Sequence, residues 1–462
     1  MKSFLQRVMP SVFGAKSPQA SAPAAAVPAR PPATQPTDTA SPDVRQIVKT
    51  VGAKRPLISA KGDIAGFEFR ISDEVYNRLQ KRNEPIAQSA HVAAALASAR
   101  LTMQTGRMGL ARLPIAWLGV WMQHNAAAEP LNGAMVALQT ADALHLNAEL
   151  KLAYSHTANR LRELGAVVGW ERSLDLEGEP DFVVVRQGDT AMAELLGSMK
   201  RWPVDIQALP SLACDIASVE DLEAALQHGV HWACGALAPN GQTLEPAEAL
   251  PVSPEAGRIG YLLNLLVTGA ETAAIVREIK GDVSLSYRLL KRLNSASFAQ
   301  QNPVISIDQA VMLLGRNELY RWLSLLLMQF AVTRKASSAL QEVALWRSRL
   351  MELLAKERDE PQPEQLFTLG LASMLGLILK MSPSDVVTTL KLPDTASQAM
   401  IDSSGPWHVY LQMAMQIEAQ EADSEVSVAD QFGGVPRVLE LADEAWAWGA
   451  DNADRSQGKA TA

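Results

Sequence analysis

The chain has 462 residues, of which 48% are hydrophobic and 20% are charged. This length exceeds that of a typical single domain, so it predicts at least two folded modules, and the composition excludes disorder of the whole chain. A formal net charge of −8 argues against general electrostatic binding to nucleic acids. The two cysteines, Cys214 and Cys234, cannot form a disulfide framework or a CxxC-type metal site. The apolar runs are too short for a transmembrane segment, so we expect a cytoplasmic protein.

The first 47 residues differ in composition from the rest. Residues 1–16 place apolar side chains at helical spacing between Lys2, Arg7 and Lys16, which allows a short amphipathic helix; a disordered end is the commoner alternative. Residues 17–47 are rich in proline and alanine and hold almost no large apolar side chain. Such a segment cannot bury enough surface to offset its ordering entropy, so we expect a disordered linker.

Between residues 48 and 250, short strand-like runs alternate with helical stretches. Ala60 to Asp63 is a hairpin signal between two predicted strands, and Gly165 is a stop signal after a helix predicted over 142–164. This alternation favours an α/β domain with a parallel sheet or barrel. The strands are predicted at 55–59, 64–70, 113–117, 134–138, 166–170, 182–186 and 204–206.

From 251 to 455 the pattern is helical almost throughout, followed by a short tail, 456–462, that we expect to be disordered. Asp282 can cap a helix that carries leucines at i, i+4 and i+8. Ser306 to Gln309 reads as a capping box, and Gly315 as the end of the helix that it starts. The second module is therefore predicted to be an all-α bundle.

The bundle contains two spaced elements, IVREIKGDVSLSYRLLKRLNSASF and ISIDQAVMLLGRNEL. These segments resemble the HDOD domain, a helical relative of HD-type metal phosphohydrolases. In that resemblance, the run Gly370 to Gly376 stands where HD enzymes carry Gly-Leu-Leu-His-Asp-Ile-Gly. Ser373 then replaces the ligand histidine and Met374 the ligand aspartate, and a hydroxyl and a thioether do not substitute in a hard-metal site. We therefore expect no metal and no phosphohydrolase activity in this module.

The first module resembles the EAL domain, a barrel whose active members hydrolyse cyclic di-GMP with two metal ions. The resemblance rests on Arg55-Pro56-Leu57-Ile58, on the strand that ends in Gly66-Phe67-Glu68-Phe69-Arg70, and on Pro180 to Val185. It implies a TIM-like barrel in which Glu68 is the first acidic position. The paired aspartates of the family are replaced by Gly169 to Arg172, and a later glutamate position reads Asp215.

The lost ligands imply a degenerate EAL-like barrel. At most Glu68, Glu171 and Asp215 remain as relict acidic positions, too few for two-metal hydrolysis. Glu68 is either a relict of the metal site that no longer binds metal, which is the favoured interpretation, or a strand-end carboxylate that pairs with a neighbour such as Arg55 or Arg70. The sequence therefore predicts no catalytic residue, no metal and no cofactor in this module.

Together the two resemblances indicate a two-module EAL–HDOD signalling protein. The favoured hypothesis is a non-enzymatic bacterial signal-transduction adaptor in which both modules contact protein partners. The alternative is a receptor that binds cyclic di-GMP without hydrolysing it; a third reading gives the bundle a ligand pocket of its own. Arg288, Lys291 and Arg292 could form a patch for an acidic or phosphorylated partner, although a solvated helix face is the more common use of such residues.

Overall fold

The protein is described from a computed structural model, in which residues 54–124, 129–140, 146–187, 190–235, 254–294, 304–328, 335–379, 382–390, 392–421 and 427–456 are placed. The expectations for residues 1–16, 17–47 and 456–462 lie outside these ranges, apart from Ser456, the last residue of the final helix. Residues 47–462 belong to one compact unit.

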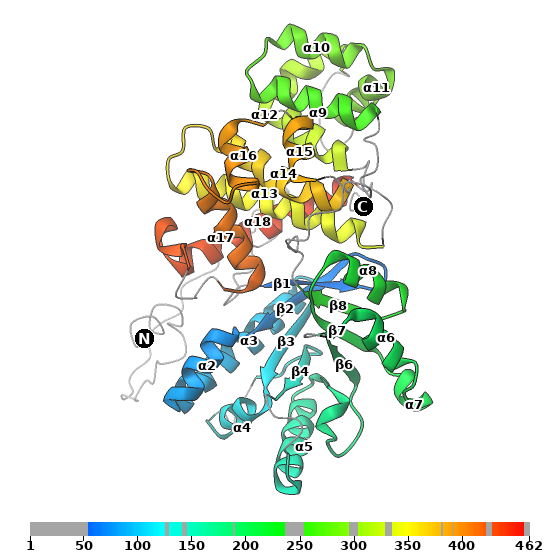
Figure 1. Cartoon of the computed structure of the whole chain (residues 1–462), viewed down its shortest axis with the longest axis vertical. Helices are drawn as coiled ribbons and strands as arrows, with labels where there is room; N and C mark the ends of the chain where they lie inside the picture. Colours follow the sequence, from blue (N-terminus) through cyan, green and yellow to red (C-terminus); the bar gives the residue numbers. More distant parts are fainter. Residues whose placement is uncertain are drawn as a thin grey trace, which may run out of the picture. The chain divides into compact units, whose positions relative to one another are not determined.

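Eight strands close into a barrel in chain order (Figure 1). The first strand runs antiparallel to both of its neighbours, and all other neighbouring strands are parallel. The expected hairpin around 60–63 is therefore present, and the predicted α/β barrel is confirmed. The strands are β1 Arg55–Ser59, β2 Ile64–Arg70, β3 Met108–Pro114, β4 Met135–Gln139, β5 Val167–Trp170, β6 Phe182–Arg186, β7 Ser211–Ile216 and β8 Trp232–Gly235.

The helices that follow the strands pack around the outside of the barrel (Figure 1). Asn147 caps α5 by accepting a hydrogen bond from the Leu150 amide, and Gly165 follows its end with a φ of 83°. The helical elements of this module are α2 Asp73–Arg82, α3 Pro85–Gln104, α4 Ile115–His124, α5 Ala148–Glu163, η2 Arg172–Leu174, α6 Met192–Met199, α7 Val204–Gln207 and α8 Val219–Gln227.

Two strand predictions were wrong. The predicted strand at 113–117 begins five residues earlier, as β3, and Ile115 already starts helix α4. Residues 204–206 belong to the short helix α7, and the strand of this region is β7, which starts at Ser211. At 113–117 a continuous apolar run was read as a strand, and such a run does not distinguish a short strand from a buried helical turn; at 204–206 the alternation Val-Asp-Ile is too short to separate the two.

The barrel interior has a small apolar core of its own. Gly169 of β5 leaves the space that the Phe182 ring of β6 fills, because a Cβ atom there would lie 2.4 Å from that ring. Nine buried side chains form this inner cluster, and the outer faces of the strands join a second, larger core. The inner cluster consists of Leu57, Leu110, Met135, Ala137, Phe182, Val184, Leu212, Cys214 and Cys234.

The second module is helical throughout its described part, as predicted. Asp282 caps α11 through the Leu285 amide, and Ser306 accepts a hydrogen bond from the Gln309 amide at the start of α12. Gly315 interrupts α12 with φ 72° and ψ 167°. The helical elements are α9 Pro254–Val267, α10 Thr272–Lys280, α11 Val283–Leu293, α12 Ile307–Met328, α13 Ser337–Glu357, α14 Pro363–Leu379, α15 Pro383–Leu390, α16 Asp394–Met400, α17 His408–Ala419, η5 Ala429–Phe432 and α18 Val435–Ser456.

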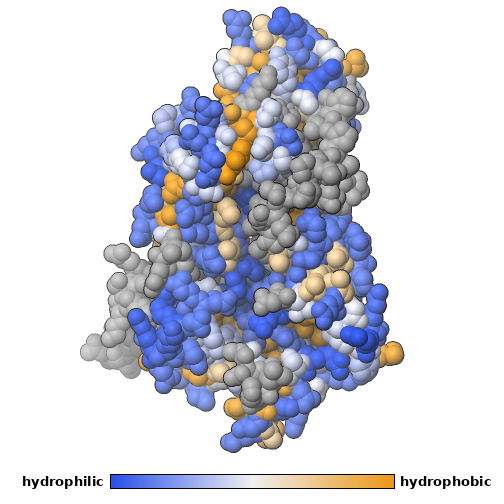
Figure 2. Space-filling view, in the orientation of Figure 1, coloured by the Kyte–Doolittle hydropathy of each residue, from blue (hydrophilic) through white to orange (hydrophobic). Residues whose placement is uncertain are grey.

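The exposed apolar surface is concentrated on the helical module. In the orientation of Figure 1, the visible face of the barrel is mainly hydrophilic, and a hydrophobic strip lies over the helices near α9 and α15 (Figure 2). Among the described helices, none has the length and apolar character needed to cross a membrane. The large exposed hydrophobic residues of the helical module are Tyr261, Val283, Tyr287, Ile305, Met312, Leu313, Ile401 and Met415.

Candidate functional site

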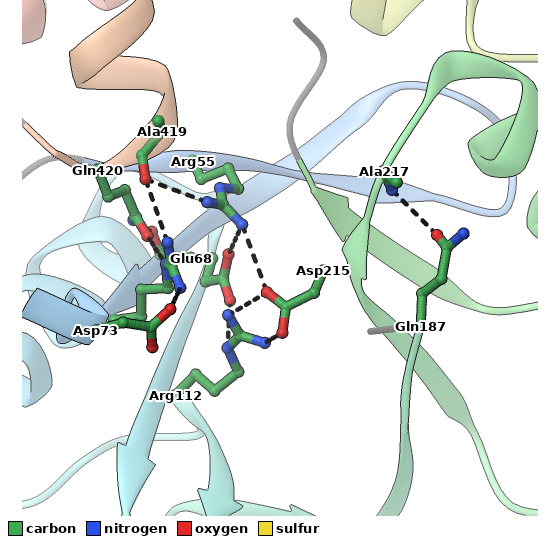
Figure 3. A network of polar contacts seen from close by, with 10 residues as sticks. Arg55, Glu68, Asp73, Arg112, Gln187, Asp215, Ala217, Ala419 and Gln420 are labelled. Carbon is green, nitrogen blue, oxygen red and sulfur yellow. Dashed lines mark hydrogen bonds and ion pairs between the residues drawn. The ribbon is translucent and has the colours of Figure 1, made fainter. Parts of the chain in front are cut away.

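A buried polar cluster lies at one end of the barrel, where strands β2, β3 and β7 end. Parallel register pairs Arg70 of β2 with Arg112 of β3, so the side chains of Glu68, Arg70 and Arg112 share one face of the sheet. Asp215 comes from β7, where the pairing with β8 is irregular between Ala213 and Ile216. The backbone of Asp215 has a φ of 54°, which aspartate tolerates better than most residues. This irregularity aims the Asp215 carboxylate at Arg112 (Figure 3).

Arg112 is the central residue of this cluster. Two of its guanidinium nitrogens donate to the two carboxylate oxygens of Asp215 at 2.7 and 2.6 Å, and its Nε lies 2.8 Å from Oε1 of Glu68. Arg55 adds longer ion contacts, 3.6 Å to Glu68 and 3.8 Å to Asp215. The side chains of Arg112 and Glu68 are 1% and 0% exposed. One guanidinium therefore contacts two carboxylates inside the barrel mouth.

This geometry shifts the pKa values of Asp215 and Arg112 in opposite directions. Burial raises the pKa of Asp215, but the hydrogen bonds and the charge of Arg112 outweigh it, so the pKa falls to about 2. Burial lowers the pKa of Arg112, and the Glu68 and Asp215 carboxylates more than compensate, so the pKa lies above its ordinary value. Around neutral pH, Asp215 and Arg112 therefore form a charged pair.

The structure brings together two of the three relict acidic positions. Glu68 and Asp215 share Arg112, whereas Glu171 follows β5 and lies 3.6 Å from Nε of Arg186 at the end of β6. The sequence analysis missed Arg112. Its signal was a single charged residue inside an otherwise apolar strand, and the misplaced start of β3 concealed it. Of the two predicted neighbours, Arg55 contacts Glu68, while Arg70 binds other groups.

Three potential metal ligands lie close together among the described residues. Glu68, Cys214 and Cys234 place one ligand atom each within 4.8 Å of one another, and all three are buried. Arg55 and Arg112 already contact the Glu68 carboxylate, so a cation bound there would face two guanidinium groups. A hydrogen bond with Cys214 and burial raise the pKa of the Cys234 thiol, which opposes the thiolate that a metal binds. These residues do not fit a divalent metal site.

A second buried arginine lies in the helical module, beside Ser373. Ser373 on α14 accepts a hydrogen bond from Arg347 of α13 at 3.0 Å, and Met374 is fully buried. Arg347 is 1% exposed and forms two hydrogen bonds with Glu418 of α17, at 2.7 and 2.5 Å. The sequence analysis named Ser373 and Met374 but not Arg347. As in the barrel, an arginine paired with a carboxylate occupies the interior.

The three basic residues of α11 do not form one free patch. Arg288 and Lys291 are exposed, and Lys291 lies 6.0 Å from the ring centre of Tyr287. Arg292 is half-buried, and both Arg288 and Arg292 have interaction partners in the structure. Only part of the predicted patch is therefore available at the surface.

Comparison with known proteins matches a family model to part of the helical module. The family model of the HDOD domain matches residues 266–400. The uncharacterized protein YuxH of Bacillus subtilis is 32% identical over 161 residues, which cover 34% of this chain and 39% of YuxH. The cyclic di-GMP phosphodiesterase CdgJ of Vibrio cholerae is 29% identical over 133 residues, 29% of this chain and 31% of CdgJ. The chain thus spans about two fifths and one third of the lengths of these relatives.

Among solved structures, an EAL domain protein from Listeria monocytogenes aligns with 41% of this chain and 87% of its own length, at 13% identity and a TM-score of 0.30. The module order expected from the sequence, a barrel and then a helical HDOD bundle, is confirmed. Residues 266–400 form an HDOD domain, and it follows a closed eight-stranded barrel.

Proposed function

We propose that this protein is a non-enzymatic adaptor in cyclic di-GMP signalling, whose barrel and HDOD domain serve as protein-interaction surfaces. The HDOD match and the relative named as a cyclic di-GMP phosphodiesterase support the signalling context. The observation that carries the non-enzymatic part of the proposal is the guanidinium of Arg112, held between Glu68 and Asp215. Its positive charge takes the place that a catalytic cation would need.

The physical argument concerns the ligand oxygens. Hydrolysis by two metal ions needs several carboxylates free to coordinate and an open position for the attacking water. Here the two carboxylates that meet inside the mouth are already bound by a fully buried arginine. A divalent cation would have to displace that arginine and leave its charge buried without a partner, which costs several kcal/mol, on the order of 3–5.

The helical module supports the same conclusion. A hydroxyl and a thioether stand at the two positions that the family resemblance assigns to metal ligands, and Arg347 is bonded to the hydroxyl of Ser373. Exposed Val283 and Tyr287 lie next to exposed Arg288 and Lys291 on α11. Apolar and basic side chains together on one helix are suited to contact with an acidic protein partner.

The proposal is tested with the purified full-length protein. We expect no conversion of cyclic di-GMP in the presence of Mg²⁺ or Mn²⁺. Chromatography of the reaction mixture measures this conversion. Calorimetric titration with Mn²⁺ is expected to show no saturable binding to the wild type. Turnover at an ordinary enzymatic rate would refute the adaptor role.

Two variants make the metal test sharper. Arg55→Gln combined with Arg112→Gln removes both guanidinium groups that contact Glu68 and Asp215, so we expect this double variant to bind Mn²⁺ that the wild type does not bind. Arg55→Lys combined with Arg112→Lys keeps both positive charges and is the matched control, which should bind no more Mn²⁺ than the wild type. If both variants keep the fold by circular dichroism and neither gains Mn²⁺ affinity, Arg112 does not take the place of the cation.

A receptor that binds cyclic di-GMP without cleaving it is the second candidate. It is favoured by the three guanidinium groups at the barrel mouth, Arg55, Arg70 and Arg112, because guanidinium groups bind phosphodiesters well; here they also contact Glu68, Asp73 and Asp215. Calorimetry with cyclic di-GMP at micromolar protein distinguishes the two: saturable heat supports the receptor, and its absence leaves the adaptor.

A further inference from the structure

The last turn of α17 lies at the mouth of the barrel, beside the polar cluster (Figure 3). The carbonyl oxygen of Ala419 accepts hydrogen bonds from Arg55 at 3.4 Å and from Arg70 at 3.2 Å. The Gln420 side chain accepts from Nε of Arg70 at 2.8 Å and donates to the backbone oxygen of Glu68 at 3.1 Å. Gln420 is buried and has a φ of 62°, which ends the helix at this point. Four hydrogen bonds thus join the end of an HDOD-side helix to strands β1 and β2.

Electrostatics explains why a helix end is stable here. Arg112 makes the short contacts to Glu68 and Asp215, so Arg55 is left with longer ion contacts of 3.6 and 3.8 Å to the same carboxylates, and Arg70 with one of 3.8 Å to the exposed Asp73. Burial and the nearby charge of Arg55 lower the pKa of Arg70, which shows that this guanidinium is held in an unfavourable surrounding. The C-terminus of a helix carries a partial negative charge and carbonyl groups without intrahelical partners. Ala419 supplies such a carbonyl to the two arginines.

The same turn is anchored on its other side in the core of the helical module. Glu418 precedes Ala419 in the chain and pairs with Arg347, which also donates to Ser373. Residues 418–420 therefore contact the buried arginine of the bundle and the arginines of the barrel mouth within three consecutive positions. A shift of this turn cannot break one set of bonds without affecting the other.

We propose that residues 418–420 form an intramolecular coupling element, through which a change at the core of the HDOD-side bundle, around Arg347, alters the barrel mouth around Arg55 and Arg70, and the reverse. The coupling is reciprocal by thermodynamic necessity. An event that moves α17 withdraws the Ala419 carbonyl and exposes two guanidinium groups at the mouth. An anion that binds these guanidinium groups competes with Ala419 and loosens α17.

Hydrogen exchange on the full-length protein, read by mass spectrometry, tests the coupling in both directions. Arg70→Ala perturbs the barrel side, and we expect exchange in the peptides of α17 and α13 to become roughly tenfold faster, the scale set by loss of a hydrogen bond to a charged group. Glu418→Gln perturbs the bundle side, and we expect a similar gain in exchange in the peptides of β2 and β3. If either variant fails to fold, Gln420→Ala replaces it, because it removes two of the four bonds and no charge.

Arg162→Ala is the matched control. Arg162 also donates to a backbone oxygen, that of Glu179 at 2.6 Å, and to the carboxylate of Asp181 at 3.1 Å, but wholly within the barrel. Its removal should change exchange near β5 and leave α17 at the wild-type rate. Changes confined to the mutated module in both Arg70→Ala and Glu418→Gln would overturn the proposal, as would additive changes in the free energy of unfolding when these two substitutions are combined.

Discussion

Arg112 of the barrel and Arg347 of the helical module are both buried arginines that pair with a carboxylate. Each is 1% exposed, and each forms a bidentate pair with a carboxylate, Arg112 with Asp215 and Arg347 with Glu418. A buried ion pair of this kind adds little net stability over apolar residues of the same volume, but removing one partner leaves a buried charge and costs about 3–5 kcal/mol.

The Asp215 carboxylate predicts a defined pH dependence. Its pKa is about 2 in the folded protein and about 3.9 in an unfolded chain, so it stabilises the fold fully above pH 4, and this stabilisation is lost as the pH falls from about 4 to about 2. We expect Asp215→Asn to lower the free energy of unfolding by about 2 kcal/mol at pH 7. The difference in the free energy of unfolding between wild type and variant should then become smaller as the pH falls toward 2.

Urea unfolding curves at several pH values between 2 and 7 measure this gap, with the exposed Asp205→Asn as a control that shows no such narrowing. A constant difference between wild type and Asp215→Asn over the whole range would mean that Asp215 is not held ionised by Arg112.

At the scale of elements, α12 shows how a single residue shapes a helix. Gly315 divides it with φ 72° and ψ 167°, a conformation that is nearly restricted to glycine. An added Cβ at this position meets no atom within 4 Å, so backbone strain alone opposes a substitution. The break changes the direction of the helix after Gly315. Tyr320, Trp322 and Leu323 of this second part are buried in the core.

Gly315→Ala is therefore expected to lower the free energy of unfolding by about 1–3 kcal/mol. Gly257→Ala is the matched control, because Gly257 lies inside α9 and its added Cβ also meets no atom within 4 Å. That variant should raise stability by up to about 1 kcal/mol, since alanine is the better helix former. Thermal melts by circular dichroism measure the stability of both variants. Equal changes in stability for the two substitutions would show that the backbone at Gly315 carries no strain.

At the scale of the whole molecule, the barrel and the bundle share an aromatic contact. The Phe67 ring of β2 meets the edge of Trp446 of α18 with 4.9 Å between ring centres, and Trp446 stacks on Trp346 of α13 at the same separation. Ion pairs surround this contact, from Lys54 to Asp443 at 2.6 Å and from Arg107 to Glu342 at 2.7 Å. An apolar centre within a rim of ion pairs favours unfolding of the two modules as one unit.

Trp446→Ala should lower the free energy of unfolding by about 3–5 kcal/mol. We also expect it to split unfolding into two transitions, one of the barrel and one of the bundle. Trp202→Ala, at a half-buried barrel position near Arg172, is the control that keeps a single transition. Urea unfolding followed by circular dichroism and by exchange of barrel peptides measures both. A single coincident transition in Trp446→Ala would show that the aromatic contact does not join the modules.

The sequence alone determined the features that depend on neighbouring residues: the hairpin at 60–63, the caps at Asp282 and Ser306, the break at Gly315 and the order of the two modules. These signals are local, because turns, caps and periodic apolar faces are set within a few positions of the chain. Only the tertiary structure decided that Arg112 meets Asp215, 103 positions away, and that Arg70 meets Gln420 across 350 positions. A buried arginine and an exposed one look the same in a sequence, since burial and pairing depend on which distant strands and helices close around them.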